Sequence, residues 1–195
     1  MGKIFCLMGK SATGKDSIYH GLFSCRKLNI KKVIPYTTRP IREGEADGRE
    51  YFFCSNETAE RLEQEKKIIE LRVYHTVYGD WKYFTADDGQ INLSENNYLL
   101  IGTLEAYLKI RDYFGAEAVV PIYVEVEDGE RLIRAIERER TQSVPKYEEM
   151  CRRFLADAAD FSEENLQKAG IEKRFVNEHL DKTMEEITEF IEQRI

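Results

Sequence analysis

The stretch MGKSATGKDS near the start of the chain constrains the fold more than any other part of the sequence. Gly9, Gly14 and Lys15 satisfy the phosphate-loop pattern GxxxxGK[ST] up to its last position, where Asp16 replaces Ser or Thr. In such a loop, backbone N–H groups and the start of the next helix bind phosphate, and the lysine bridges the β- and γ-phosphates. An apolar run precedes this loop and a helical pattern follows it, which disfavours the alternative of a structural glycine turn. We therefore expect a strand, a loop and a helix that bind a nucleoside triphosphate.

Composition excludes several other classes. A chain of 195 residues with 42% apolar content can bury one substantial core, so we expect one domain with inserted subregions. The net charge of -7 and the pI near 5.2 argue against binding to a nucleic-acid backbone. No apolar run approaches the ~20 residues of a membrane span, and the N-terminus resembles no targeting segment. The four cysteines form no CxxC pair and the three histidines have no ligand spacing, so we expect a reduced, cytoplasmic protein without zinc.

The order of apolar patterns predicts an α/β fold. Strands are expected at residues 4–8, 32–36, 97–102, 118–126 and 173–177, and helices at 16–28, 104–114, 129–139, 145–161 and 180–195. For the helix at 145–161 we expect Pro145 in the first turn and Ser143 as the cap. Alternating strands and helices imply right-handed crossovers and a parallel sheet. Residues 51–54, 68–74 and 77–84 add three strands around a helix at 56–67, which predicts a small β-rich insert.

Several classes of protein use a triphosphate site. A GTP switch needs an NKxD motif, which this chain lacks, and its only DxxG lies at a helix end. A small-molecule kinase needs a second anion site with arginines and a mobile basic lid. The loop TTRPIREGEADG carries Arg39 and Arg42, and the segment RAIERER carries Arg134 and Arg138 on one helix face. The sequence therefore favours a kinase over a GTP switch.

Three segments resemble the guanylate kinase family. TTRPIREGEADGREYFF, residues 37–53, is similar to the family's TTRxPRxGExxGxDYxF, except for the placement of the proline. IELRVYHTVYG, residues 69–79, resembles FIEWAxFxGNYYG, and FVNEHLDKTMEEI, residues 175–187, resembles VNDDLDKAxxEL. The resemblance implies a P-loop NTPase-type three-layer fold with a five-stranded parallel sheet, a β-rich acceptor-binding insert and a helical lid. By position, the core would comprise 1–34, 86–133 and 154–195, the insert 35–85 and the lid 134–153.

The resemblance also implies the site residues. For ATP it implies Gly9, Lys10, Ser11, Ala12, Thr13, Gly14, Lys15, Asp16, Ser17 and Asn177. For the acceptor it implies Arg39, Arg42, Tyr51, Glu70, Tyr78 and Thr103. For catalysis it implies Lys15, Arg39, Arg134, Arg138 and Arg153.

The chemistry of these side chains supports those roles, although each has a simpler alternative. Guanidinium forks suit phosphate oxygens, and a carboxylate at Glu70 can accept from the N1–H and amino group of guanine, which adenine does not present together. The alternatives are a solvated charged loop for the arginines of the insert and an exposed strand glutamate for Glu70. Tyr78 could instead pack in the core, and Asn177 could cap a turn. The lid arginines could pair with Glu130, Glu137 and Glu139 on a solvated helix face.

Four positions depart from the family pattern. Pro35 replaces a serine that touches the acceptor phosphate, and Asp80 replaces a hydroxyl that meets guanine O6, for which Thr85 is a substitute. Ile101 and Thr103 stand in place of two strand-end aspartates, one of which reads the base while the acidic strand end helps to hold magnesium. The fourth departure is Asp16.

We hypothesise that the last two departures are linked. Anionic charge would have moved from the strand end to Asp16, where a carboxylate can hold Mg²⁺ beside the phosphates. The alternative is that Asp16 caps the helix that begins there.

These observations predict an ATP-dependent nucleoside monophosphate kinase that uses Mg²⁺, with GMP or dGMP as the first candidate acceptor. Its partners would be ATP and a nucleoside monophosphate, with no nucleic acid and no membrane. Two alternatives stay open: a kinase of another small phosphorylated acceptor, and a non-catalytic guanylate kinase-like binding module. The intact loop with Lys15 argues against the second of these.

Overall fold

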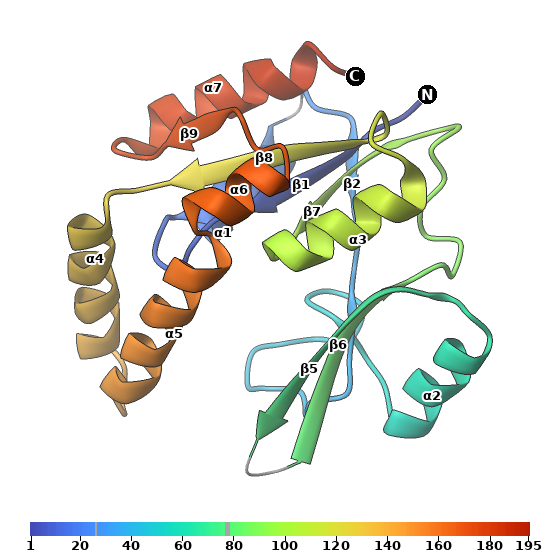
Figure 1. The fold of residues 1–195 in the computed structure, drawn as a ribbon, viewed down its shortest axis with the longest axis horizontal. Coiled ribbons are helices and arrows are strands. Elements are labelled where there is room, and N and C mark those ends of the chain that lie inside the picture. Colours follow the sequence, from blue (N-terminus) through green and yellow to red (C-terminus); the bar gives the residue numbers. More distant parts are fainter. Residues whose placement is uncertain (26, 77–78) are drawn as a thin grey trace.

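The structure is a computed structural model that describes residues 1–25, 27–76 and 79–195. Its central sheet has five strands in the order β2-β7-β1-β8-β9, and every pair of neighbouring strands is parallel. These strands are β1 (Ile4–Met8), β2 (Ile30–Lys32), β7 (Asn97–Ile101), β8 (Val119–Glu125) and β9 (Arg174–Val176). The predicted α/β class and five-stranded parallel sheet are confirmed (Figure 1).

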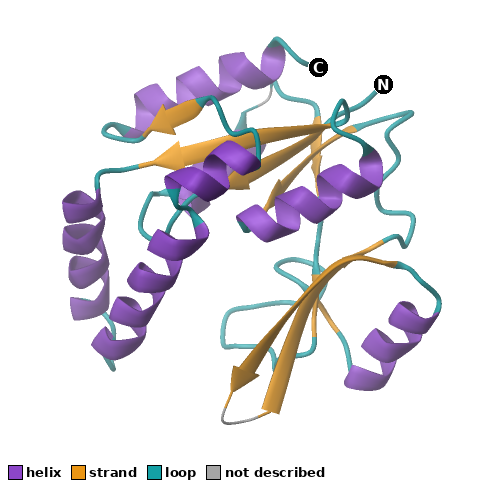
Figure 2. Cartoon of the chain, in the orientation of Figure 1, coloured by secondary structure: helices purple, strands orange, loops and turns teal. Residues whose placement is uncertain are grey.

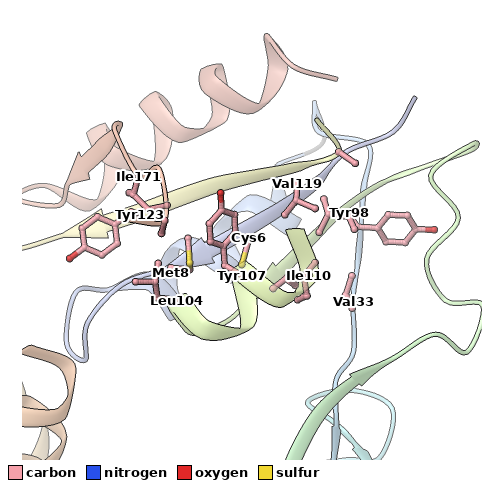
Figure 3. Packing of buried hydrophobic residues seen from close by; sticks show 14 of the residues in the cluster. Cys6, Met8, Val33, Tyr98, Leu104, Tyr107, Ile110, Val119, Tyr123 and Ile171 are labelled. Atoms are coloured by element: carbon pink, nitrogen blue, oxygen red, sulfur yellow. The ribbon is translucent and has the colours of Figure 1, made fainter. Parts of the chain in front are cut away.

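Helices cover both faces of this sheet, because its central strands are apolar on both sides. Along β1, Ile4, Cys6 and Met8 pack with α3 (Leu104–Phe114) and α6 (Glu163–Lys168). Phe5 and Leu7 point to the other face and pack with α1 (Lys15–Ser24) and α7 (Leu180–Glu192). Figure 3 shows the first cluster, in which side chains of α3 meet β1 and β7. The fold therefore has three layers, as the sequence predicts.

A second sheet forms the insert. It has four strands in the order β4-β3-β6-β5. These are β3 (Tyr36–Thr37), β4 (Phe52–Phe53), β5 (Ile68–Thr76) and β6 (Gly79–Ala86), and α2 (Asn56–Gln64) packs beside them. Ser55 caps α2 by accepting a hydrogen bond from the Thr58 N–H. Figure 2 shows the long β5–β6 hairpin projecting away from the main sheet. The insert has a small core of its own around Phe84, whose ring stacks on Tyr36.

Two helices, α4 (Asp128–Arg140) and α5 (Tyr147–Asp160), follow β8 and form an antiparallel pair at one end of the sheet (Figure 1). The prediction that α5 starts at Pro145 with a Ser143 cap is wrong. The cap position is Lys146, whose N–H donates to a carboxylate oxygen of Glu139 at 3.0 Å. This hydrogen bond links the turn to the end of α4, and α5 begins after it, at Tyr147.

Two further elements differ from expectation. The second strand, expected at 32–36, is β2 at Ile30–Lys32, an edge strand with exposed lysines. Helix α6 was not expected, because its six residues are too few to show an apolar period, although Ser162 caps it by accepting from the Asn165 N–H. No helix in the described part of the chain is long and apolar enough to cross a membrane.

Candidate active site

The loop between β1 and α1 has the backbone of a phosphate cradle. A Cβ at Gly9 would lie 2.5 Å from the Val124 carbonyl oxygen, and Gly14 has a φ of 82°. Ala12 also adopts a left-handed φ of 64°. The Asn177 side-chain amide donates to the Thr13 carbonyl oxygen at 2.8 Å and lies only 2.6 Å from a Cβ placed on Gly14. The loop therefore packs against β8 at Gly9 and is hydrogen-bonded to Asn177, the residue that follows β9.

Lys15 and Asp16 are the first two residues of α1, and Gly14 is its N-cap. Asp16 is exposed in the first turn. Because Gly14 occupies the cap position, the alternative that Asp16 caps the helix is wrong. A lone carboxylate beside a triphosphate cradle fits the way proteins hold Mg²⁺, which commonly takes one or two carboxylates plus substrate phosphates. Within the described residues, no three His, Cys, Asp or Glu side chains gather into a metal site of their own.

Arg39 is the most constrained of the predicted acceptor ligands. Its side chain is 3% exposed, and its guanidinium is paired with both carboxylate oxygens of Glu45, at 2.7 and 2.5 Å. It lies 5.1 Å from the ring centroid of Tyr51 and 5.3 Å from that of Phe53. Its Nε is the one buried side-chain nitrogen or oxygen in the described chain without a hydrogen-bond partner. Arg39 therefore does not point into bulk solvent, and it retains a buried donor.

The electrostatics of the insert follow from this pair. The Arg39 hydrogen bond, helped by a backbone hydrogen bond from Arg42, lowers the pKa of Glu45 to about 2. Burial raises the pKa of the Tyr51 hydroxyl, which keeps it a neutral hydrogen-bond donor. Arg42 is exposed at the surface of the same loop. Tyr78, the remaining phosphate ligand predicted in the insert, lies outside the described residues.

Glu70 lies on β5 and is buried, with only 1% of its side chain exposed. Arg72 donates to it through Nε at 3.0 Å and Nη2 at 3.3 Å, and the Thr85 hydroxyl donates at 3.0 Å. The alternative of an ordinary exposed glutamate is therefore wrong. Asp80, by contrast, is at the exposed end of the hairpin and lies 2.7 Å from Nδ1 of His75.

A cleft of about 340 Å³ lies between β5 of the insert and the helices α3, α5 and α6. Arg72 and Tyr74 line it from the insert, while Thr103 lines it from the start of α3, which the Thr103 hydroxyl caps by accepting from the Ala106 N–H. Glu105 and Asp160 add carboxylates to the opposite wall. Burial, followed by the charges of Asp157 and Glu105, raises the pKa of Asp160.

The predicted lid arginines lie on α4 and α5. Arg134 donates to Glu130 at 2.8 Å and to the Asn177 carbonyl oxygen at 3.3 Å, which brings it to the edge of the phosphate loop. Arg138 is exposed, and Arg153 is 54% exposed and donates to Glu149 at 2.8 Å. Glu149 also accepts from Arg152, and these arginines lower its pKa to about 2. The alternative for the lid arginines is that they pair with glutamates on a helix surface. Such an ion pair forms between Arg134 and Glu130.

Sequence reasoning missed three residues of this region: Arg72, Arg131 and Asp157. Arg131 is 1% exposed and donates through Nε to the Ser11 carbonyl oxygen at 2.9 Å. Asp157 accepts from the Ser11 N–H at 2.6 Å and from Arg131 at 3.3 Å. No local signal links α5 to a loop 146 residues earlier. For Arg72 a signal existed, because residues two apart on a strand share a face and Arg72 follows Glu70 by two.

Comparison with known proteins decides the family. The sequence model described as Guanylate kinase matches residues 1–194. The chain belongs to the guanylate kinase family. It is thus a guanylate kinase-like phosphotransferase of the P-loop, nucleoside monophosphate kinase type, as predicted from the sequence.

Individual relatives agree with this assignment. The chain is 28% identical over 198 residues to a guanylate kinase of Porphyromonas gingivalis, covering 100% of this chain and 99% of the relative. It is 29% identical over 192 residues to a guanylate kinase of Caldanaerobacter subterraneus subsp. tengcongensis, covering 97% and 86%. A crystal structure of guanylate kinase from Anaplasma phagocytophilum matches with a TM-score of 0.66 and 22% identity, covering 98% of this chain and 85% of that one. The structural likeness supports the shared fold.

Proposed function

We propose that this protein transfers the γ-phosphoryl group of ATP to GMP or dGMP, giving ADP and GDP or dGDP. Two kinds of anion site support the proposal. The loop with Lys15 suits a triphosphate, and the insert holds a second cation, Arg39, with an unused donor. A scaffold module that binds no phosphate would require neither the loop with Lys15 nor the unpaired donor of Arg39.

The observation that carries the proposal is the buried, unpaired Nε of Arg39. An unsatisfied buried donor costs free energy, so such groups are rare unless a ligand completes them. Glu45 fixes the guanidinium through its two other nitrogens, which leaves the Nε side for an acceptor. Tyr51, whose ring lies beside the guanidinium, adds a neutral donor, and Arg42 adds charge at the rim. Together they suit the phosphate of a nucleoside monophosphate.

In the proposed reaction, an oxygen of the acceptor phosphate attacks the γ-phosphorus of ATP. The bond from that phosphorus to the β,γ-bridging oxygen breaks, and ADP leaves with the electron pair. Lys15 would neutralise charge on the transferred group, and Arg39 would hold the attacking phosphate in line. Asp16 would hold Mg²⁺, which neutralises phosphate charge when bound.

The lid arginines would complete this charge neutralisation. Arg134 already lies beside the loop, whereas Arg138 and Arg153 are exposed and would approach the phosphates on closure of residues 134–153. Asn177 would support the loop and contact the adenine of ATP. Closure would also exclude water and so suppress hydrolysis of ATP.

The test is an assay of ADP release with MgATP against a panel of ribo- and deoxynucleoside monophosphates. We expect release that depends on GMP or dGMP. Arg39→Lys, which keeps the charge but loses the fork, should lower kcat/KM for the acceptor at least about tenfold. Arg49→Ala is the matched control, because Arg49 lies in the same insert, is 55% exposed and pairs with its neighbour Glu50. ADP release that no acceptor stimulates would contradict the proposal.

A further inference from the structure

The carboxylate of Glu70 already accepts three hydrogen bonds, out of the about four that a carboxylate can accept. Arg72 reaches both of its oxygens, and the Thr85 hydroxyl donates to one of them, so three donors converge on one carboxylate. The Glu70 side chain is 1% exposed, whereas that of Arg72 is 17% exposed. Glu70 therefore lies behind Arg72, seen from the cleft, and it is Arg72 that lines the cleft wall.

The cleft thus presents a donor where an acceptor was expected. A guanidinium has five N–H donors and no acceptor. Glu70 takes the Nε donor and one at Nη2, which leaves donors on the two Nη nitrogens. Burial opposes the charge of Arg72, but the charge of Glu70 and its hydrogen bonds outweigh burial and raise the pKa of Arg72. The group that meets an acceptor base from this wall is therefore a permanent cation with a planar fork.

Most other positions that could read the base already have hydrogen-bond partners. Asp80 is at the hairpin end beside His75, and the Thr85 hydroxyl donates to Glu70. Across the cleft, Thr103 caps α3 and Glu105 accepts from Lys109 at 2.7 Å. Among the described residues of the lining, Asp160, at the end of α5, is the carboxylate that is not engaged in this way, and it lies on the wall opposite Arg72. Reading of the 2-amino group by Asp160 would appear as a large loss of activity with IMP.

We propose that Arg72 selects a 6-oxopurine acceptor by donating to its O6 and N7, that Glu70 is a positioning residue for Arg72, and that the 2-amino group contributes little to selection. This inference rests on the proposed function, since it names how the acceptor of that reaction is chosen. An arginine fork matches the paired acceptors O6 and N7 of guanine and hypoxanthine. Adenine presents a donor beside N7 and is disfavoured.

The alternative is direct reading of guanine by Glu70, and it requires the ion pair to open. Guanine would have to displace Arg72 from both carboxylate oxygens. The guanidinium would then lose its bidentate partner, and the other carboxylates of the cleft lining are Glu105, already paired with Lys109, and Asp160 on the opposite wall. Such a loss is costly for a largely buried charge. The two readings differ in which atoms of the base matter, so nucleotide analogues separate them.

Two analogues of GMP provide the test. IMP lacks the 2-amino group, and 7-deaza-GMP lacks the N7 acceptor. With MgATP and the wild-type protein, we expect IMP to be used within about threefold of GMP, and 7-deaza-GMP to lose about tenfold in kcat/KM, the loss of one hydrogen bond of a bidentate pair. A tenfold or greater loss with IMP, together with unchanged use of 7-deaza-GMP, would overturn the inference and leave the proposed function standing. If no monophosphate is phosphorylated, the proposed function falls and this inference falls with it.

Variants of Arg72 make the test independent of overall activity, because each readout is a ratio between two acceptors in one variant. Arg72→Ala should abolish the preference for GMP over 7-deaza-GMP. It should also create a preference for GMP over IMP, since Glu70 is then exposed to the N1–H and the amino group. Arg72→Lys serves if the alanine variant does not fold, and it should lose the N7 preference because an ammonium lacks the fork. Arg174→Ala is the control, since Arg174 is a strand arginine paired with Glu125 and Glu163 away from this cleft, and both ratios should match wild type. Ratios for Arg72→Lys equal to those of wild type would refute the role of Arg72.

Discussion

Asp157 on α5 accepts a hydrogen bond from the backbone N–H of Ser11 in the phosphate loop, at 2.6 Å. The same carboxylate oxygen meets Arg131 of α4 at 3.3 Å, and Arg131 in turn donates to the Ser11 carbonyl oxygen. The two helices that carry the predicted lid arginines are therefore fastened to the loop that would bind the donor. Closure of the proposed lid would be connected to the shape of the loop through Ser11, Arg131 and Asp157.

Removal of the Asp157 carboxylate should weaken this connection. Asp157→Ala leaves Arg131 with Asp128 and the Ser11 carbonyl as partners, so we expect a loss of about 1–3 kcal/mol in the free energy of unfolding, typical for a hydrogen bond to a charged group. Asp157→Asn keeps an oxygen for the Ser11 N–H and should lose less. Urea unfolding measures both variants. Equal stability of Asp157→Ala and wild type would show that the contact contributes nothing.

Gly14 should not tolerate a side chain. Gly14→Ala places a Cβ 2.6 Å from the amide nitrogen of Asn177, in addition to the strain of a φ of 82°. Gly115→Ala is the matched control, since Gly115 has a φ of 90° but nothing within 4 Å of its Cβ position. Both variants should lose stability from the backbone alone, about 1–2 kcal/mol for the left-handed Gly14 and about 1–3 kcal/mol for Gly115, whose ψ of 147° lies in a region open essentially to glycine. Only Gly14→Ala should also lose ATP binding, measured by calorimetry, and equal ATP affinity in the two variants would contradict the close packing of Gly14 against Asn177.

The free energy of unfolding should decrease in acid, because protonation of Glu45 removes its ion pair with Arg39. The pKa of Glu45 is lowered to about 2, so the unfolded chain binds a proton at Glu45 before the folded protein does. The stabilisation is complete above the ordinary glutamate pKa, about 4.3, and is lost as the pH falls toward 2. Glu45→Gln should therefore show a weaker fall in unfolding free energy between pH 5 and 2 than wild type. Identical pH profiles would mean that Glu45 is not paired in solution.

Asp16 should determine the need for magnesium. If its carboxylate holds the ion, Asp16→Asn should raise the Mg²⁺ concentration that gives half-maximal acceptor-dependent ADP release, by about tenfold or more, while KM for GMP stays close to wild type. A titration of Mg²⁺ at saturating ATP measures this. An unchanged magnesium requirement would remove Asp16 from the metal site.

Much of the architecture could be predicted because it depends on local patterns. The glycine loop lies between a strand and a helix as its motif requires, and helix α3 spans Leu104–Phe114 as expected from its apolar period. Helix α6 was missed because six residues carry too little pattern. The start of α5 depends on a contact between Lys146 and Glu139, which no pattern within α5 reveals.

The site was less predictable than the fold, for a physical reason. Family motifs located Arg39 and Glu70, but a motif does not say which partner already occupies a side chain. Glu45 fixes Arg39, and Arg72 covers Glu70. The contact of Asp157 with Ser11 spans 146 positions and arises only from the packing of α5 against the loop.

The most direct test of phosphoryl transfer to GMP follows the phosphoryl group itself. The protein is incubated with ATP labelled on its γ-phosphate, Mg²⁺ and GMP, and the labelled products are separated. We expect label in GDP, with this transfer lost in Lys15→Ala and reduced in Arg39→Lys. Label that appears only as inorganic phosphate, or remains in ATP with every monophosphate offered, would contradict the proposed transfer.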